Sequence, residues 1–154
     1  MHGMDLATLE ELKRLKYRYL RNLDAKQWNE FADTLTEDVT GNYGAKLSFV
    51  GREQLVGFMS DSLPDSIITV HQCHHPEIEI DSDTATGRWY LEDKVYILEH
   101  RMLLTGAAFY EDEYRREDGT WRISKTGYTR IYEAVQSLDD TPTWKLTAGA
   151  GMSE

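Results

Sequence analysis

The first third of the chain carries apolar residues at the spacing of an α-helix. Over residues 5–23 they recur every three or four positions and form one broad stripe, made of Leu6, Leu9, Leu12, Leu15, Tyr19 and Leu23. Asp24 and Gln27 stand three residues apart, as in a capping box, and predict a second, short helix over residues 25–35. A third helix is expected over residues 52–61, after Gly51 and before Pro64.

Residues 37–50 and the chain from residue 66 onward favour β-structure instead. In 37–50, glycine turn signals separate apolar positions and predict two short strands. Long strands over 67–80 and 84–98 should form a hairpin, and two more, over 102–117 and 121–132, are joined by an Asp-Gly turn. Three helices followed by a mostly antiparallel sheet indicate an α+β domain. Helices on one face of such a sheet can leave an apolar pocket.

The register of the first hairpin brings a histidine opposite a carboxylate. A two-residue loop at Ser82–Asp83 pairs residues whose numbers add up to 165. The proline of His75–Pro76 has no N–H for a strand ladder, so a bulge is expected there. One extra residue changes the sum to 164 and places His71 opposite Asp93, with Cβ atoms about 5 Å apart. This pair is a candidate acid/base site.

Composition narrows the class of protein. With 154 residues, one domain is expected over residues 1–135, with a C-terminal tail over 136–154. The net charge of −10 disfavours nucleic acids and anionic membranes, because both bind basic surfaces. Cys73 is the only cysteine, which excludes an internal disulfide and fits a reducing compartment. No apolar run is long enough for a bilayer and no secretory leader is recognisable, so a cytoplasmic protein is expected.

Asp24 has two interpretations. It lies at the end of the first predicted helix, where the negative end of the helix dipole disfavours a carboxylate. Either it caps the second helix, or it orients a histidine and stabilises the protonated form of that histidine. Tyr19 lies about 140° round an ideal helix from Asp24. The two therefore share a pocket only if the helix end bends or the pocket wraps around it.

Asp93 shares strand parity with Trp89 and Leu91 and therefore faces the same side as two large apolar residues. A carboxylate in that setting is costly unless it is paired. Arg130, late in the last long strand, is the candidate partner, and a purely structural ion pair is the alternative. The nearby tyrosines are interpreted as wall and packing residues; they are Tyr110, Tyr114, Tyr128 and Tyr132.

Three histidines, His71, His74 and His75, raise the question of a metal site. In a regular strand His71 and His75 share a face, but a bulge between them removes that relation. No cysteine or acid stands beside them at a recognisable zinc spacing. No metal is therefore expected.

Several longer motifs resemble the SnoaL-like branch of the NTF2-like superfamily. They are the helix-then-sheet order, the DAKQW run of residues 24–28, the His-x-x-x-His-Pro run of residues 71–76 and the ATGRWY run of residues 85–90. This superfamily includes scytalone dehydratase, a hexachlorocyclohexane dehydrochlorinase, steroid isomerases and polyketide cyclases. Over residues 10–135 the chain is most similar to the bile acid 7α-dehydratases, through residues 85–93, Gly106, 108–110, 118–119, Trp121, 126–128 and 130–133.

The resemblance implies a cone in which three N-terminal helices pack in a strongly curved, mixed, mostly antiparallel sheet. It also implies five catalytic residues, all of which are present: Tyr19, Asp24, His71, Asp93 and Arg130. The residues expected to line the substrate pocket are Trp89, Phe109, Tyr110 and Tyr128. The chain departs from these enzymes in a shorter segment over residues 94–105, in His75 where they have threonine, and in its C-terminal tail. Because of these departures, the resemblance predicts the reaction better than it predicts the side chain of the substrate or whether the substrate is a thioester.

The implied reaction removes water from a 7-hydroxy-3-oxo-4-ene steroid or bile acid. His71, oriented by Asp24, is the expected base, because histidine ionises near neutral pH. Tyr19 is expected to stabilise the dienolate oxygen, and Asp93, held by Arg130, to assist the departing hydroxyl. No metal, nucleotide or flavin is required.

The expected partner is a small hydrophobic substrate, as a free acid or a coenzyme A thioester, and the resemblance implies a homotrimer or homodimer. Two alternatives stay open. One is a related lyase or isomerase that acts on another alicyclic or polyketide-like carbonyl compound. The other is a non-catalytic module of the same fold that binds a small molecule.

Overall fold

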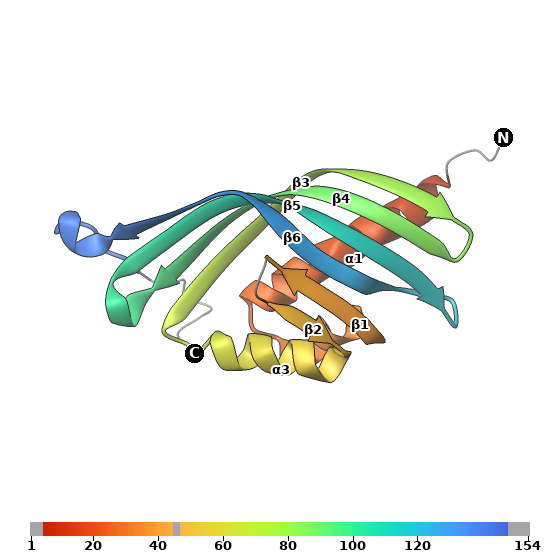
Figure 1. Cartoon of the computed structure of the whole chain (residues 1–154), viewed down its shortest axis with the longest axis horizontal. Helices are drawn as coiled ribbons and strands as arrows, with labels where there is room; N and C mark the ends of the chain where they lie inside the picture. Colours follow the sequence, from red (N-terminus) through yellow and green to blue (C-terminus); the bar gives the residue numbers. More distant parts are fainter. Residues whose placement is uncertain (1–4, 45–46, 148–154) are drawn as a thin grey trace.

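The computed structural model describes residues 5–44 and 47–147 and contains one six-stranded sheet with helices against one of its faces (Figure 1). The helices are α1 (Leu6–Asp24), α2 (Trp28–Asp33) and α3 (Arg52–Ser62), with short 3₁₀ turns η1 (Leu98–His100) and η2 (Leu138–Asp140). The strands are β1 (Leu35–Tyr43), β2 (Ser48–Val50), β3 (Ile67–Asp81), β4 (Thr84–Ile97), β5 (Met102–Glu117) and β6 (Thr120–Ser137). The α+β class predicted from the sequence is confirmed.

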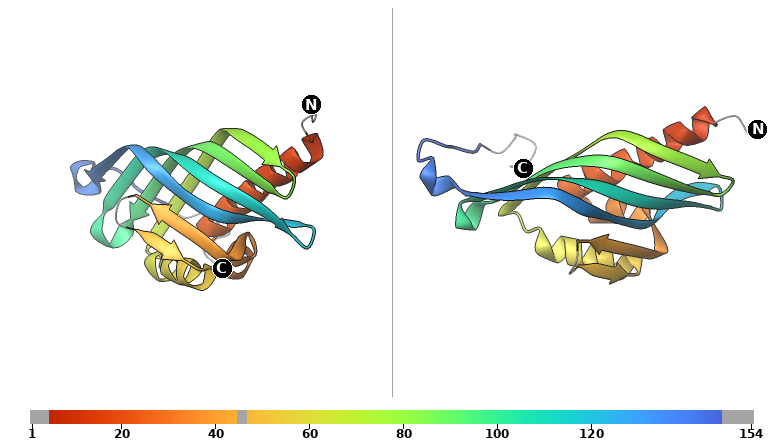
Figure 2. Two further views of the ribbon diagram at one scale, coloured as in Figure 1. Left: turned by 45° about the vertical axis from the view of Figure 1, so that its right-hand side comes forward. Right: turned by 45° about the horizontal axis from the view of Figure 1, so that its top comes forward.

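The sheet has the order β2-β1-β6-β5-β4-β3 and is antiparallel except for the parallel pair β1–β6. The four long strands follow one another along the chain and arch over the helices, with α1 running diagonally under them (Figures 1 and 2). α3 packs on β1, which lies toward the opposite edge of the sheet from β3. The mixed, strongly curved sheet and its three helices form the predicted cone.

The hairpin of β3 and β4 has the predicted register. Asp81 pairs with Thr84 across the two-residue turn, and His71 pairs with Asp93. The ladder shifts by one residue between His74 and Glu77, where His75 has a positive φ of 30°. The bulge expected at His75–Pro76 is therefore confirmed, and it sets the face to which His71 points.

The end of α1 differs from the prediction. The amides of Lys26 and Gln27 bond to the carbonyls of Leu23 and Asn22, and Lys26 has a φ of 56°, which together form a Schellman turn. Gln27 is the N-cap of α2 and makes no side-chain cap bond. The predicted capping box is therefore wrong: Asp24 stays in the last turn of α1, and its carboxylate is free to bond elsewhere.

The core lies between α1 and the inner face of the long strands. α1 contributes Leu12, Leu15 and Tyr19, all at most 1 % exposed. The strands contribute alternate residues of their inner faces, including Ala85, Trp89, Leu91, Ala108, Tyr110, Tyr114 and Ile123. β6 continues to Ser137, two residues beyond the predicted end of the domain at residue 135, and Leu138 after it is buried.

Within the described residues no helix is long and apolar enough to cross a membrane.

Candidate active site

A cavity of about 250 Å³ lies between the inner face of the sheet and the helices. Most of its wall is apolar, and its polar groups come from α3 and from β1, β3, β4, β5 and β6. The lining residues are Leu23, Tyr43, Leu47, Phe58, Met59, Ser62, Leu63, Thr69, His71, Asp93, Val95, Leu104, Tyr110, Tyr128, Arg130 and Glu133. Three of the five residues expected to be catalytic, His71, Asp93 and Arg130, therefore face one cavity.

Asp24 lies directly behind His71. One carboxylate oxygen of Asp24 is 2.6 Å from Nδ1 of His71 and also accepts a bond from the Thr69 hydroxyl at 2.9 Å. Its second oxygen accepts the backbone N–H of His71 at 2.8 Å. Of the two interpretations of Asp24, the geometry supports the one in which it orients a histidine. Because Nδ1 is engaged, Nε2 is the ring nitrogen left for a ligand.

Asp93 and Arg130 form a bidentate ion pair. The guanidinium nitrogens of Arg130 lie 2.5 and 3.0 Å from the two carboxylate oxygens of Asp93. The Asp93 side chain is only 3 % exposed, and a buried carboxylate needs such a partner. Gly106, opposite Asp93 on β5, makes room for the pair, because a Cβ there would collide with the guanidinium of Arg130.

Tyr19 is in the core behind the cavity and is not among the residues that line it. Its hydroxyl is 2.6 Å from the hydroxyl of Tyr43, and Tyr43 does line the cavity. Burial raises the pKa of both phenols well above the usual value for tyrosine. Both therefore stay protonated at neutral pH, and if Tyr19 donates to Tyr43, the hydroxyl of Tyr43 can donate into the cavity. Sequence reasoning missed Tyr43.

Two of the four expected pocket residues lie elsewhere. Tyr110 and Tyr128 line the cavity, whereas Phe109 is 37 % exposed and packs against Tyr90 on the outer face of the sheet. Phe109 and Tyr110 are consecutive strand residues and must point to opposite faces. Trp89 shares the face of Asp93 but lies four residues away, where its indole donates to the hydroxyl of Tyr114.

A fully buried ion pair underlies the tyrosines. The Lys16 ammonium is 2.8 Å from a carboxylate oxygen of Asp112, and neither side chain is exposed. The same ammonium lies 3.5 Å from the ring centroid of Tyr110 and 4.5 Å from that of Tyr19. Asp112 also accepts hydroxyl bonds from Thr126 and Tyr114. No local pattern in the sequence indicates this pair, because Lys16 lies on α1 and Asp112 on β5.

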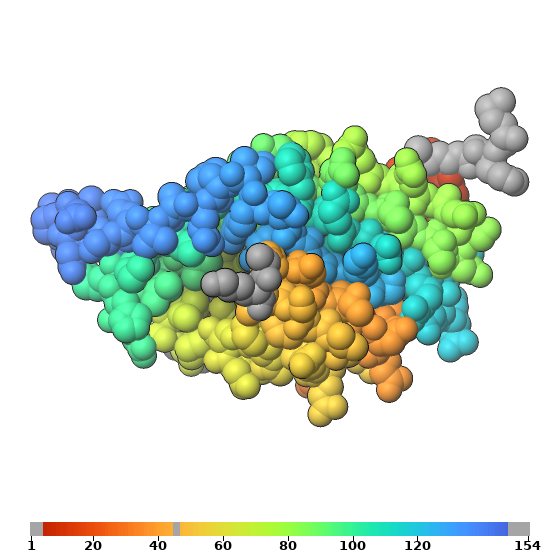
Figure 3. Space-filling model, viewed as in Figure 1, coloured from red at the N-terminus to blue at the C-terminus, as the bar shows by residue number. Residues whose placement is uncertain are grey.

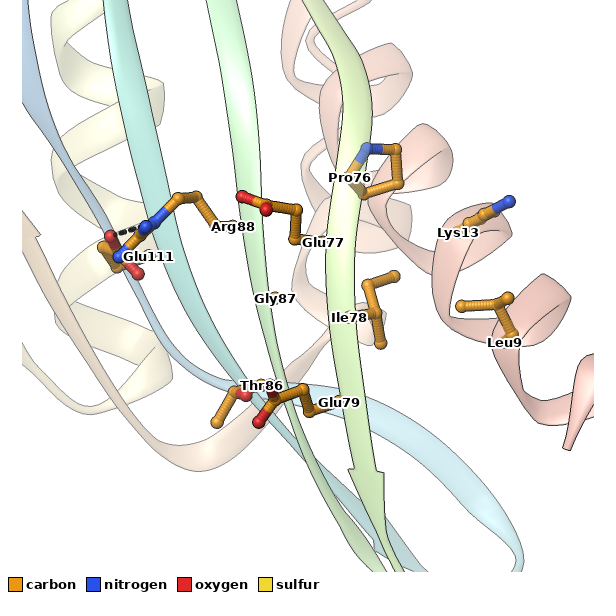
Figure 4. A pocket seen from close by; sticks show the side chains of 10 residues that line it. All are labelled: Leu9, Lys13, Pro76, Glu77, Ile78, Glu79, Thr86, Gly87, Arg88 and Glu111. Carbon is orange, nitrogen blue, oxygen red and sulfur yellow. Dashed lines mark hydrogen bonds and ion pairs between the residues drawn. The ribbon is translucent and has the colours of Figure 1, made fainter. Parts of the chain in front are cut away.

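Among the residues that the structure describes, no three histidine, cysteine, aspartate or glutamate side chains are grouped so that they could hold a metal ion. A larger surface groove of about 650 Å³ follows β3 near the bulge. Figure 4 shows Leu9 and Lys13 of α1 on one side of β3 and the Arg88–Glu111 ion pair on the other. The lining of this groove contains no histidine and none of the five predicted catalytic residues. The smaller cavity is therefore the candidate site.

Solved structures of similar shape support this view of the fold. A type 2 hexachlorocyclohexane dehydrochlorinase has 22% sequence identity and a TM-score of 0.78, covering 85% of this chain and 90% of its own. A putative scytalone dehydratase from Novosphingobium aromaticivorans has 18% identity and a TM-score of 0.78, covering 84% and 88%. A type 3 dehydrochlorinase from Novosphingobium barchaimii has 21% identity and a TM-score of 0.75, covering 86% and 92%. At these identities the likeness establishes the fold.

The sequence itself matches the family described as "SnoaL-like domain" over residues 4–127. This range contains both strands of the long hairpin, the bulge, and four of the five predicted catalytic residues, with Arg130 just beyond its end. The match covers well over half of the chain, and the chain therefore belongs to the SnoaL-like family, with the NTF2-like cone fold.

Proposed function

We propose that the protein is a cofactor-independent lyase that eliminates water from a hydroxylated alicyclic carbonyl compound. The observation that carries the proposal is a pair of dyads at one apolar cavity, His71 with Asp24 and Arg130 with Asp93. His71 and Asp93 are directly opposed on the adjacent strands β3 and β4. The structural neighbours named as a dehydrochlorinase and a putative scytalone dehydratase support the same class, because both names describe eliminations.

His71 is the base in this proposal. In this proposal Nδ1–H donates a hydrogen bond to Asp24, so Nε2 carries the lone pair. Nε2 can then take a proton from the carbon that the substrate carbonyl activates. The carboxylate then stabilises the imidazolium that forms, as in hydrolase triads. The His71 side chain is only 12 % exposed, so little water competes for Nε2.

Tyr43 takes the role that the resemblance assigned to Tyr19. As the proton leaves, negative charge moves to the carbonyl oxygen, which needs a donor already in place. Tyr43 lines the cavity, and in this proposal its hydroxyl donates to that oxygen. The two hydroxyls are 2.6 Å apart, and in this proposal Tyr19 is the donor, which leaves the O–H of Tyr43 to point into the cavity.

The leaving group departs on the side of Arg130. The electron pair of the enolate re-forms the carbonyl and the new double bond while the C–O bond breaks. The His71 imidazolium returns its proton to the departing hydroxyl, so that water leaves and the base is regenerated. Arg130 stabilises the developing charge on the oxygen, and Asp93 holds the guanidinium in place through two bonds.

The walls select an apolar, ring-shaped substrate. Leucine, methionine, phenylalanine and tyrosine side chains form most of the lining. A volume of about 250 Å³ is slightly below the range of about 300–1,000 Å³ typical of sites for drug-sized ligands. The cavity therefore encloses the reacting ring and a neighbour. A 7-hydroxy-3-oxo-4-ene steroid or bile acid, as free acid or thioester, is our candidate substrate, with the distal rings outside the cavity.

Incubation with such steroids tests the proposal directly. Dehydration extends the enone to a 4,6-dienone, and its red-shifted absorbance can be followed continuously. Compact cyclic β-hydroxyketones, which fit entirely within the cavity, form a second substrate set that yields enones. If neither set is dehydrated by the wild-type protein, as free acids or thioesters, the lyase proposal fails.

Replacement of Tyr43 by phenylalanine is expected to lower kcat by about 10²–10³-fold, the usual effect of losing one donor to a developing oxyanion. Tyr19→Phe should cost only about tenfold, since the Tyr43 hydroxyl remains. Steady-state kinetics of the two variants measure the difference. A larger loss in Tyr19→Phe than in Tyr43→Phe would return the donor role to Tyr19.

A further inference from the structure

The inner face of the sheet continues beyond the candidate site. β4, β5 and β6 run past the level of His71 and Asp93, and their far ends project beyond the helices (Figures 1 and 3). Directly opposed residues on neighbouring strands share a face, so the strand register shows which side chains follow the site along this face.

Three successive rows cross the sheet here. The first row contains the charged site, with His71 opposite Asp93, which is opposite Gly106, which is opposite Glu133. The second row contains Thr69, Val95, Leu104 and Val135, and the third contains Ile67, Ile97, Met102 and Ser137. Six of the eight positions in the second and third rows are apolar: Ile67, Val95, Ile97, Met102, Leu104 and Val135. We call these six residues the apolar track.

The apolar track is continuous with the cavity. Val95 and Leu104 line the cavity themselves, and Glu133 of the first row lines its rim. Farther out, Val135 is 58 % exposed, and Ile67, Ile97 and Met102 are partly exposed. Two rows along a strand correspond to about 13 Å at 3.3 Å per residue. An apolar surface of this length leads directly away from His71.

We infer that the apolar track is a substrate subsite that holds the part of an elongated, fused-ring substrate lying beyond the reacting ring. The inference rests on the proposed function. The cavity encloses only part of such a molecule, and the surface that continues from it offers hydrocarbon contacts and no charged residue in its second and third rows. The enzyme would then favour extended polycyclic compounds over compact ones.

Two neighbouring residues of β6 provide a matched test. Val135 points to the inner face, opposite Leu104, whereas Ala134 is exposed on the outer face, opposite Thr105. Val135→Asp places a carboxylate on the apolar track, and Ala134→Asp places the same charge on the same strand but outside the track. Val135→Ser removes the apolar side chain without adding charge.

Binding of unreactive ligands, measured by quenching of tryptophan fluorescence, gives a readout that requires no turnover. The ligands are a four-ring 3-oxo-4-ene steroid without a hydroxyl leaving group and a two-ring enone. We expect Val135→Asp to weaken steroid binding about tenfold and enone binding less than twofold, because a carboxylate against hydrocarbon loses its hydration. Val135→Ser should act in the same direction but less strongly, and Ala134→Asp should change neither affinity.

Several outcomes would overturn the inference. Equal weakening of both ligands by Val135→Asp, or the same effect from Ala134→Asp, would show that the track gives no selectivity for length. Failure of the wild-type protein to bind the steroid would show that the apolar track is not a steroid subsite. A lower sedimentation coefficient for Val135→Asp than for Ala134→Asp would show that a second copy of the chain covers the track. If only the lyase proposal is wrong, the variants should still show this pattern of steroid and enone affinities, although no substrate is dehydrated.

Discussion

Replacement of His71 by glutamine is expected to reduce kcat of the proposed elimination by about 10²–10⁴-fold, the usual contribution of a positioned general base. Glutamine keeps the approximate size of the side chain but cannot accept a proton at the cavity. The matched control is His74→Gln: His74 lies on the same strand but is exposed and stands at the opposite strand parity. Dienone formation by the two variants measures the effect, and full activity in His71→Gln would remove histidine from the mechanism.

Asp24 and His71 should behave as one unit. Asp24→Asn replaces an acceptor of the Nδ1 proton by an amide that can present its NH₂ group, which disfavours the tautomer with a free Nε2. The double variant Asp24→Asn/His71→Gln should therefore be no slower than His71→Gln alone, since effects within a catalytic unit are not additive. Multiplicative losses would mean that Asp24 acts separately, for instance by fixing the end of β3 through Thr69.

The hairpin was predictable because its determinants are local. Ser82–Asp83 fixes the loop, and the proline of His75–Pro76 fixes the bulge. Parity then places His71 opposite Asp93. The partner of Asp93 was also inferable, because a buried carboxylate on an apolar face requires a cation and Arg130 stands late in the last long strand.

Other parts of the site depend on packing between distant segments. Tyr43 reaches the cavity because β1 pairs in parallel with β6, a pairing between segments about 85 residues apart that no local pattern specifies. Tyr19 was placed in the site by resemblance, whereas its helix position turns it into the core. The capping box at Asp24 and Gln27 failed because a Schellman turn at Lys26 ends α1, and the lysine side chain holds that turn by bonds to the carbonyls of Pro64 and Ile67.

The buried pair of Lys16 and Asp112 has the largest expected effect on stability. A Lys16→Met substitution keeps the length of the side chain but leaves the Asp112 carboxylate fully buried without a cation. Loss of one partner of a buried ion pair typically costs about 3–5 kcal/mol, a large fraction of the stability of an ordinary domain. The control is Lys13→Met, one turn earlier on α1 and partly exposed, for which a change within about 0.5 kcal/mol is expected.

Urea denaturation, monitored by circular dichroism, measures both variants, and a double substitution separates charge from packing. In Lys16→Met/Asp112→Asn the amide oxygen can accept the bond from Thr126 while the amide NH₂ donates to the hydroxyl of Tyr114, and no uncompensated charge is buried. The double variant should therefore be more stable than Lys16→Met alone, which is a coupling of the sign expected for a buried pair. If the double variant is instead less stable than Lys16→Met, the unpaired carboxylate is not the source of the loss, and neutralisation of Asp112 is not the main role of the ammonium.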